Sequence, residues 1–103
     1  MKTMFIATVV SGNVVTIKLD GRFTFAAHAD FRKVSQETIA GSCKAIEIDF
    51  AKVESLDSAA QGMLLLAREG ATRVEKTISF VNCKGEAKQI LEMSGFKRLF
   101  SFR

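Results

Sequence analysis

The sequence predicts a single α/β domain with a mixed β-sheet of about four strands and three to four helices packed on it. The hydrophobic pattern switches between a period of two residues, typical of strands, and a period near 3.6, typical of helices. Segments of the two kinds follow one another in the order β-β-α-β-α-β-α. The chain has 103 residues, which suffice for one hydrophobic core but not for two. We therefore expect one domain over residues 1–103.

The first two strands are expected to form a hairpin. Residues 4–10 read as a strand, and Gly12-Asn13 separates them from a second β-like segment, a spacing that favours a tight turn. Residues 14–19 alternate between more and less apolar side chains, so one face of this strand should be buried. Gly21 is expected to close the strand.

The later elements follow from the same two periods. They are a helix from about 26 to 41, a strand over 45–50, a helix over 58–73, a strand over 76–82 and a helix from about 85 to 94. A short polar link, Ala51 to Ser55, should join the strand at 45–50 to the next helix. Residues expected in the core include the aromatic side chains Phe23, Phe25 and Phe31, the contiguous segment Met63 to Leu66, and the apolar tail Phe96, Leu99, Phe100 and Phe102.

Asp57 and Ser58 occupy the place where function is expected. The segments 45–50, 58–73 and 76–82 should form a right-handed strand–helix–strand crossover. Both residues then lie outside the carboxyl end of a strand, where open α/β sheets usually build their sites. A helix N-terminus offers unpaired N–H groups and a positive dipole end, so a phosphate on Ser58 would be well placed. Spacing alone leaves open that Ser58 only caps the helix, and Asp57 is itself a favoured cap.

The sequence offers no catalytic, cofactor or metal-binding constellation, and we expect no enzymatic activity. His28 is the only histidine, so neither a catalytic triad nor a histidine metal set can form within the chain. No P-loop, dinucleotide fingerprint or HExxH motif is present. Cys43 and Cys83 lack metal-like spacing and are expected to be free thiols.

The charge and hydropathy of the chain limit which partners and which cellular compartment are expected. The net charge is +4, and residues 84–103 contribute five basic and two acidic side chains. These basic residues are scattered and no nucleic-acid motif accompanies them, so a solvated helix face is favoured over direct nucleic-acid binding. No apolar segment approaches the roughly 20 residues that span a bilayer, and no signal peptide opens the chain. A cytoplasmic protein is expected.

Two segments carry a resemblance to a known family. Residues 46–50, Ile-Glu-Ile-Asp-Phe, followed by residues 56–66, Leu-Asp-Ser-Ala-Ala-Gln-Gly-Met-Leu-Leu-Leu, resemble the signature of STAS domains, and within that family the bacterial anti-sigma factor antagonists. The likeness covers nearly the whole chain, including Gly21-Arg22-Phe23 and the ending at residues 95–100. It implies a STAS-type fold.

The resemblance also implies partners and site residues. In the family, the serine after the aspartate is phosphorylated by an anti-sigma factor with serine-kinase activity, and a PP2C-type phosphatase reverses the modification. Carried over, Ser58 is the phosphorylation site. The partner-binding residues are Asp57, Ser58, Ala59, Ala60, Gln61 and Gly62. Many members have glycine where this chain has Ala60, a departure that bears on how closely a partner approaches Ser58.

The implied function is a partner switch in signal transduction and transcription regulation. Unphosphorylated, the protein would bind an anti-sigma factor, and phosphorylation of Ser58 would release it. The alternative is a non-switching STAS subunit of a larger assembly, such as a lipid-transport or stress-signalling complex, in which Ser58 is a contact residue only. Nucleotide binding is a third possibility, but no phosphate-cradling loop supports it.

Overall fold

A computed structural model describes residues 4–103, so the first three residues of the predicted domain lie outside the described part. The described chain contains five strands, three α-helices and two 3₁₀ helices. In chain order these are β1 (Met4–Ser11), β2 (Val14–Phe23), η1 (Phe25–Ala27), α1 (His28–Ala40), β3 (Ala45–Leu56), α2 (Ser58–Arg73), β4 (Thr77–Val81), α3 (Gly85–Met93), η2 (Phe96–Arg98) and β5 (Ser101–Phe102).

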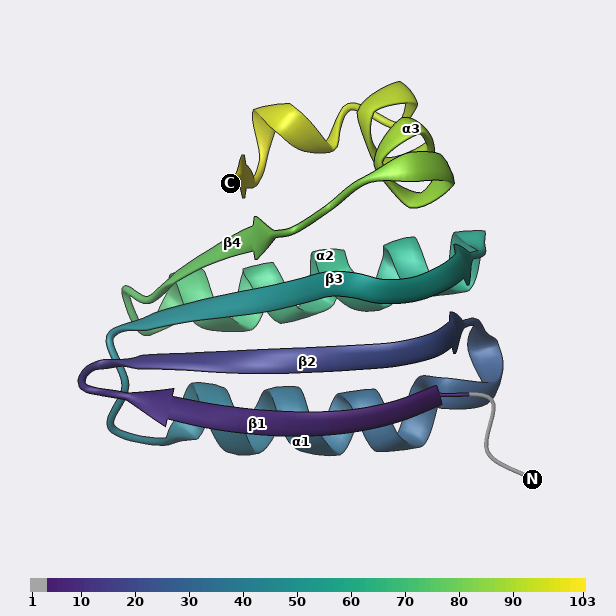
Figure 1. The fold of residues 1–103 in the computed structure, drawn as a ribbon. Coiled ribbons are helices and arrows are strands. Elements are labelled where there is room, and N and C mark those ends of the chain that lie inside the picture. The colour runs from purple at the N-terminus through teal and green to yellow at the C-terminus, as the bar shows by residue number, and fades with distance from the viewer. Residues whose placement is uncertain (1–3) are drawn as a thin grey trace.

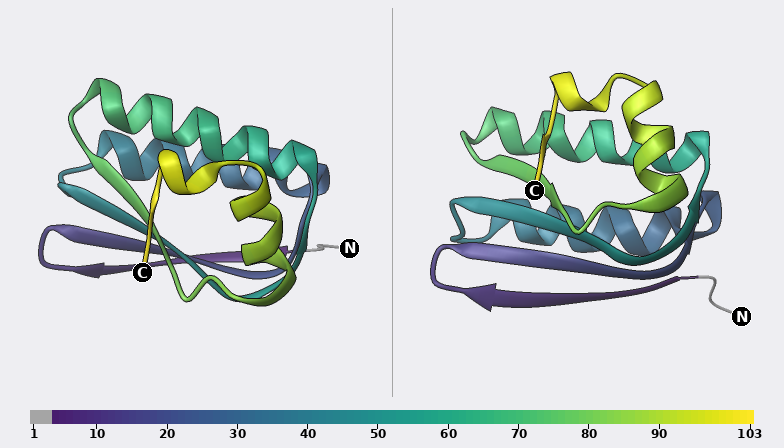
Figure 2. Two further views of the ribbon diagram at one scale, coloured as in Figure 1. Left: turned by 90° about the horizontal axis from the view of Figure 1, so that it is seen from above. Right: turned by 45° about the horizontal axis from the view of Figure 1, so that its top comes forward.

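The five strands form one mixed sheet in the order β1-β2-β3-β4-β5. β1 is antiparallel to β2, and the other neighbours are parallel. Helices α1 and α2 lie side by side on one face of the sheet, while α3 and η2 close the end beyond β4 (Figures 1 and 2). The predicted α/β class and mixed sheet are confirmed. The strand beyond the expected four, β5, is only two residues long.

The hairpin forms as predicted, with Gly12 in the turn at a φ of +59°. The prediction that Gly21 closes β2 is wrong. Gly21 is buried within the strand at a φ of +119°, and the pairing of β2 with β3 shifts register between Gly21 and Arg22. A glycine that tolerates this backbone lets the strand continue past the irregularity to Phe23.

The predicted polar link at Ala51–Ser55 is also wrong. β3 continues without a break to Leu56, because its second half pairs with β2: Lys52 lies opposite Asp20 and Val53 opposite Gly21. Asp57 is therefore the single residue between the end of β3 and the start of α2.

The core lies between the sheet and the helices. Ile46, Ile48 and Phe50 all point into it from β3. Around β4 the core consists largely of aromatic side chains. The ring of Phe80 lies 4.8 Å from that of Phe50 and 4.3 Å from that of Phe100. Of the C-terminal tail, Phe96 and Phe100 are buried and Phe102 is half-buried, whereas Leu99 is 40% exposed.

Two further predictions about the core are wrong. Phe25 is 66% exposed, because the chain leaves the strand direction after Phe23 and turns into η1. On α2, Met63 and Leu64 are buried, but Leu66 is 69% exposed and Leu65 is also on the surface. The sheet and α1 do not cover the outer side of α2, so these residues remain available for contacts with another molecule.

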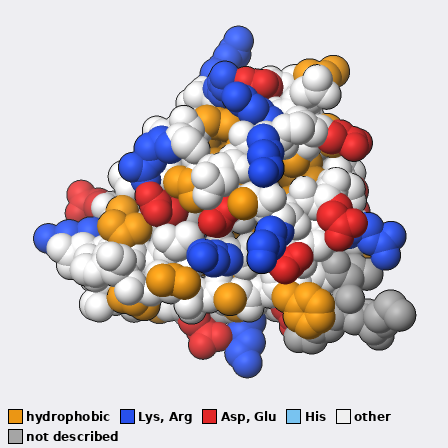
Figure 3. All heavy atoms as spheres, in the orientation of Figure 1, with side chains coloured by type: hydrophobic (Ala, Val, Ile, Leu, Met, Phe, Trp, Pro, Cys, Tyr) orange, Lys and Arg blue, Asp and Glu red, His pale blue; other side chains and the backbone are white. Residues whose placement is uncertain are grey.

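The opposite face of the sheet is open to solvent. On it the Thr16 hydroxyl donates to the Glu47 carboxylate, which also pairs with the guanidinium of Arg103. Arg103 donates in addition to the hydroxyl of Ser79. Figure 3 shows charged side chains of both signs across this side, with small separate groups of hydrophobic side chains between them.

Candidate protein-docking site at the start of α2

Ser58 is the first residue of α2, and its side chain is exposed. It follows β3 by two residues, so it lies just outside the carboxyl end of a parallel strand. Within residues 4–103 the structure gives no hydrogen-bond partner to the N–H groups of Ser58 and Ala59. An anionic group on Ser58 would therefore lie beside free donors and the positive end of the helix dipole.

Asp57 fixes the position of this helix start. One carboxylate oxygen accepts from the N–H of Ala60 at 2.8 Å, which is the N-cap interaction expected from the sequence. The other accepts from the N–H of Phe25 at 3.1 Å. The N–H of Asp57 donates to the carbonyl of Phe23. The same aspartate therefore caps α2 and ties it to the connection between β2 and α1.

The six residues predicted to bind a partner do not all face outward. Ser58 and Gly62 are exposed, and Asp57, Ala59 and Gln61 are half-buried. Ala60 is fully buried in the core, with 0% of its surface exposed. Its methyl group points inward. Alanine in place of the family's usual glycine therefore affects the packing of the core here, and not the surface offered to a partner.

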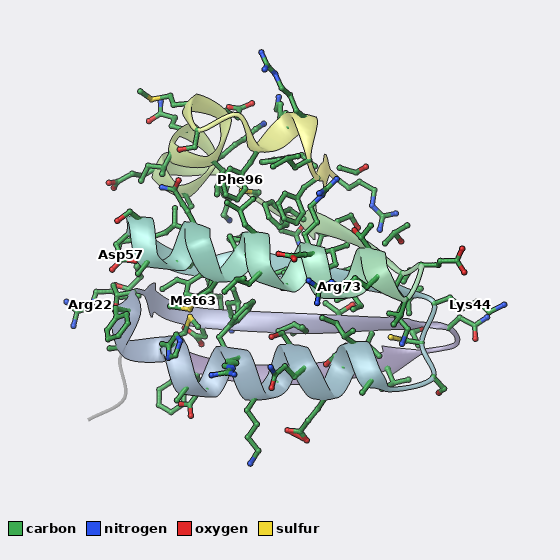
Figure 4. All side chains as sticks on the ribbon, turned by 180° about the vertical axis from the view of Figure 1, so that it is seen from behind. Arg22, Lys44, Asp57, Met63, Arg73 and Phe96 are labelled. Carbon is green, nitrogen blue, oxygen red and sulfur yellow. The ribbon has the colours of Figure 1, made fainter. Side chains whose placement is uncertain are left out.

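An exposed ring pair adjoins the site. The ring of Phe25 stacks on that of His28, with centroids 5.4 Å apart. His28 is exposed at the start of α1. Sequence reasoning missed Phe25 as a surface residue near Ser58, because the hydrogen bond from its N–H to Asp57 joins distant parts of the chain. Figure 4 shows Arg22, at the end of β2, on this same side of the molecule as Asp57.

The described residues show no further kind of site. None of the helices within 4–103 has the length and apolar character to cross a membrane. The same residues contain no cluster of three or more His, Cys, Asp or Glu side chains that could hold a metal ion. Cys43 and Cys83 are both free thiols, as predicted.

Comparison with known proteins places this geometry in a family. The family model described as "Mlab, STAS domain" matches residues 6–101, nearly the whole chain. The chain belongs to the STAS domain family. A relative in Pseudomonas aeruginosa strain UCBPP-PA14, the STAS-domain containing protein PA14_20770, is 42% identical over 89 residues, which is 86% of this chain and 87% of the relative. The family resemblance drawn from the sequence is confirmed.

The solved structures similar to this STAS domain include anti-sigma factor antagonists. The antagonist from Mycobacterium paratuberculosis superposes with a TM-score of 0.87 at 19% identity, over 96% of this chain and 84% of that one. SpoIIAA of Bacillus in its phosphorylated form gives 0.75 at 19% identity, over 96% and 91% of the two chains. Unphosphorylated SpoIIAA gives 0.79 at 19% identity, over 96% and 88%. At this level of identity the likeness establishes a shared fold.

Proposed function

We propose that this STAS domain protein is an anti-sigma factor antagonist controlled by phosphorylation of Ser58. Unphosphorylated, it binds an anti-sigma factor with serine-kinase activity through the exposed start of α2. The partner transfers the γ-phosphoryl group of ATP to the Ser58 hydroxyl and then dissociates, and a PP2C-type phosphatase restores the free serine. The protein acts in the cytoplasm by binding and catalyses no reaction itself. The observation that carries the proposal is the exposed Ser58 hydroxyl at a helix N-terminus fixed by Asp57.

Phosphorylation at this position changes the surface without opposing the fold. It adds a charge of about −1.5 to −2 and three acceptor oxygens. The two free N–H groups of the first turn and the helix dipole favour such a group, so α2 should remain intact. The similarity of this fold to both the phosphorylated and the unphosphorylated form of SpoIIAA supports a switch that keeps the fold.

The phosphate acts on the interface with the partner. A partner that covers Ser58 must remove the water from a doubly charged group, and the half-buried Asp57 adds a like charge beside it. An unpaired buried charge costs several kcal/mol, and about 2.7 kcal/mol already lowers affinity a hundredfold. Release therefore needs no large conformational change.

The test is a pull-down from native cell lysate with four baits: wild type, Ser58→Ala, Ser58→Asp and Ser42→Asp. Ser42 is an exposed serine in the loop before β3, at the other end of that strand from Ser58, so it controls for added charge. We expect a kinase-like anti-sigma protein on every bait except Ser58→Asp. The purified partner with ATP should then phosphorylate wild type and leave Ser58→Ala unmodified. The same proteins on all four baits would contradict the proposal.

A second function is favoured by the family model itself, whose description is the Mlab STAS domain and not an antagonist. In this alternative the protein is a constant subunit of a larger assembly, such as a lipid-transport or stress-signalling complex, and Ser58 is only a contact. The assembly should then co-purify in fixed stoichiometry, and Ser58→Ala should leave it unchanged. Size-exclusion chromatography of the native complex distinguishes this from a partner that leaves on phosphorylation.

A further inference from the structure

An apolar groove runs between α1 and α2 on the side of the molecule away from the sheet. It has a volume of about 550 Å³, and its walls come from residues 28–40 of α1, residues 63–73 of α2 and Val74, which follows α2. Eleven helical residues span roughly 16 Å, so the groove matches about three turns of another helix. Figure 4 shows Met63 pointing into the space between the two helices. Its floor is formed by the apolar side chains of Phe31, Ile39, Met63 and Ala67, together with the buried Ser35, whose hydroxyl donates to the carbonyl of Arg32.

Both walls carry exposed polar side chains, which on α2 are Glu69 and Arg73. On the α2 side Leu66 and Val74 are exposed at 69% and 53%. Gly70 lies between them, and a Cβ there would come within 3.4 Å of the side chain of Ile39, so the missing side chain lets α1 and α2 approach closely at this point. The α1 wall is polar and contributes the exposed Arg32.

The charge of Arg32 is not neutralised within the described chain. The structure gives its guanidinium no ion pair or hydrogen bond there. The other arginine of the groove, Arg73, is paired with Glu69 at 2.6 Å. A ligand that fits these walls therefore has an apolar stripe for the floor and a carboxylate on the side that faces α1.

The groove is continuous with the start of α2. Residues four apart form a ridge along a helix, and on α2 one such ridge contains Ser58, Gly62, Leu66 and Gly70 and is continued by Val74, the residue after the helix. Ser58, Gly62, Leu66 and Val74 are exposed, and Gly70 is half-buried. A Cβ at Gly62 would meet nothing within 4 Å, so the surface is flat beside Ser58 and becomes apolar at Leu66.

We infer that the α1–α2 groove docks an amphipathic helix of the partner protein, with an apolar stripe over Leu66 and an acidic side chain on Arg32. The inference rests on the proposed function, since it identifies how the partner released by phosphorylation of Ser58 is held. Recognition of a helix through anchors at i, i+3, i+4 and i+7 is a common mode for grooves of this form. The helix extends along the ridge toward Ser58, so a phosphate there acts at one end of the bound helix.

Photo-crosslinking identifies the occupant. A benzophenone maleimide is attached to Leu66→Cys in a Cys83→Ser background, and to Met93→Cys in the same background as the control. Met93 is 88% exposed on α3, outside the groove, and the remaining thiol of Cys43 is buried. After irradiation in native lysate, we expect the Leu66 probe to capture one protein through an acidic amphipathic segment that the Met93 probe does not reach.

Titration of the captured segment, as a synthetic labelled peptide, tests the recognition. Arg32→Glu should weaken binding about tenfold or more, because a charge-assisted hydrogen bond is replaced by like-charge repulsion. Lys33→Glu makes the same charge change at the next residue of α1, which does not line the groove, and should change affinity less than about twofold. Leu66→Asp should abolish binding. All three side chains are exposed, so the fold should survive each change.

The outcomes separate this inference from the proposed function. No capture by the Leu66 probe beyond that at Met93, capture of lipid or of a second copy of this chain, or equal effects of Arg32→Glu and Lys33→Glu would overturn the groove assignment. If Ser58→Asp, carrying the Leu66 probe, captures the same segment with undiminished yield, the groove assignment stands and the phosphorylation switch fails.

Discussion

The carboxylate of Asp57 accepts hydrogen bonds from two places: the first turn of α2 and the N–H of Phe25, 32 residues earlier in the chain. One side chain therefore sets both the direction of the helix and the position of the neighbouring connection.

Replacing Asp57 with alanine should destabilise the protein by about 1–2 kcal/mol, because the N-cap bond and the bond to Phe25 are both lost. Urea unfolding followed by circular dichroism measures this. Asp20→Ala removes an exposed carboxylate from β2 and should change stability by less than about 0.5 kcal/mol. Equal losses in the two variants would show that the Asp57 bonds contribute nothing.

Gly62→Ala should stabilise the fold and weaken partner binding. The residue is exposed in the middle of α2, and the added methyl group meets no atom within 4 Å. Alanine in a helix is favoured over glycine by roughly 1 kcal/mol. The same methyl group stands on the ridge next to Ser58, where it obstructs a closely docked partner. The melting temperature of the variant should therefore rise while its affinity for the partner falls. A variant with both a higher melting temperature and a higher affinity would argue against this docking surface.

Lys76 holds the end of α1 to the start of β4. Its ammonium group donates to the carbonyls of Ile39 and Gly41, each at 2.6 Å. Lys76→Met removes both hydrogen bonds and should cost about 1–2 kcal/mol. Lys44→Met, at an exposed lysine before β3, is the matched control and should be near neutral. Unfolding free energies from urea titration compare the two.

Phe80 is the centre of the C-terminal aromatic cluster. It contacts the rings of Phe50, Phe96, Phe100 and Phe102 and is fully buried. Phe80→Ala should cost about 3–5 kcal/mol through lost burial and the cavity left behind. Phe25→Ala removes a ring that is largely exposed and should cost far less. Hydrogen exchange should show protection lost first around β5 in Phe80→Ala, and unchanged protection there would refute the central role of this ring.

Cys83 should make stability fall at high pH. Burial raises the pKa of its thiol to about 11, although Lys88 opposes the shift and Glu92 adds to it. The folded state then holds this proton more tightly than the unfolded state does. The resulting stabilisation is complete below about pH 9 and is lost as the pH rises to about 11. Urea titrations of wild type and Cys83→Ala should diverge over that interval, whereas parallel curves would exclude the effect.

Much of the fold was predictable because periodicity reports burial. The segments around Ile48 and Phe80 gave strands and those around Phe31 and Leu64 gave helices, and the order of the elements gave the class. The second half of β3 was not recognised, because residues 51–55 carry small and polar side chains whose pairing with β2 decides their conformation.

The position of the candidate site in the chain was predictable, but the shape of the surface around it was not. Ser58 and Asp57 follow from their position after a strand and before a helix. The burial of Ala60, the exposure of Phe25 and the groove beside Leu66 depend on contacts between distant segments. A local pattern cannot distinguish an apolar residue that faces the sheet from one left at the rim of a groove.

The order of the strands in the sheet has a consequence for synthesis. Each strand pairs with the strand before it in the chain, from β1 to β5. No strand must be inserted later between two that are already paired, so the sheet can be extended from one edge as the polypeptide is synthesised. The hairpin of β1 and β2 supplies the first template, each helix closes the crossover behind it, and the aromatic cluster around Phe80 is completed last.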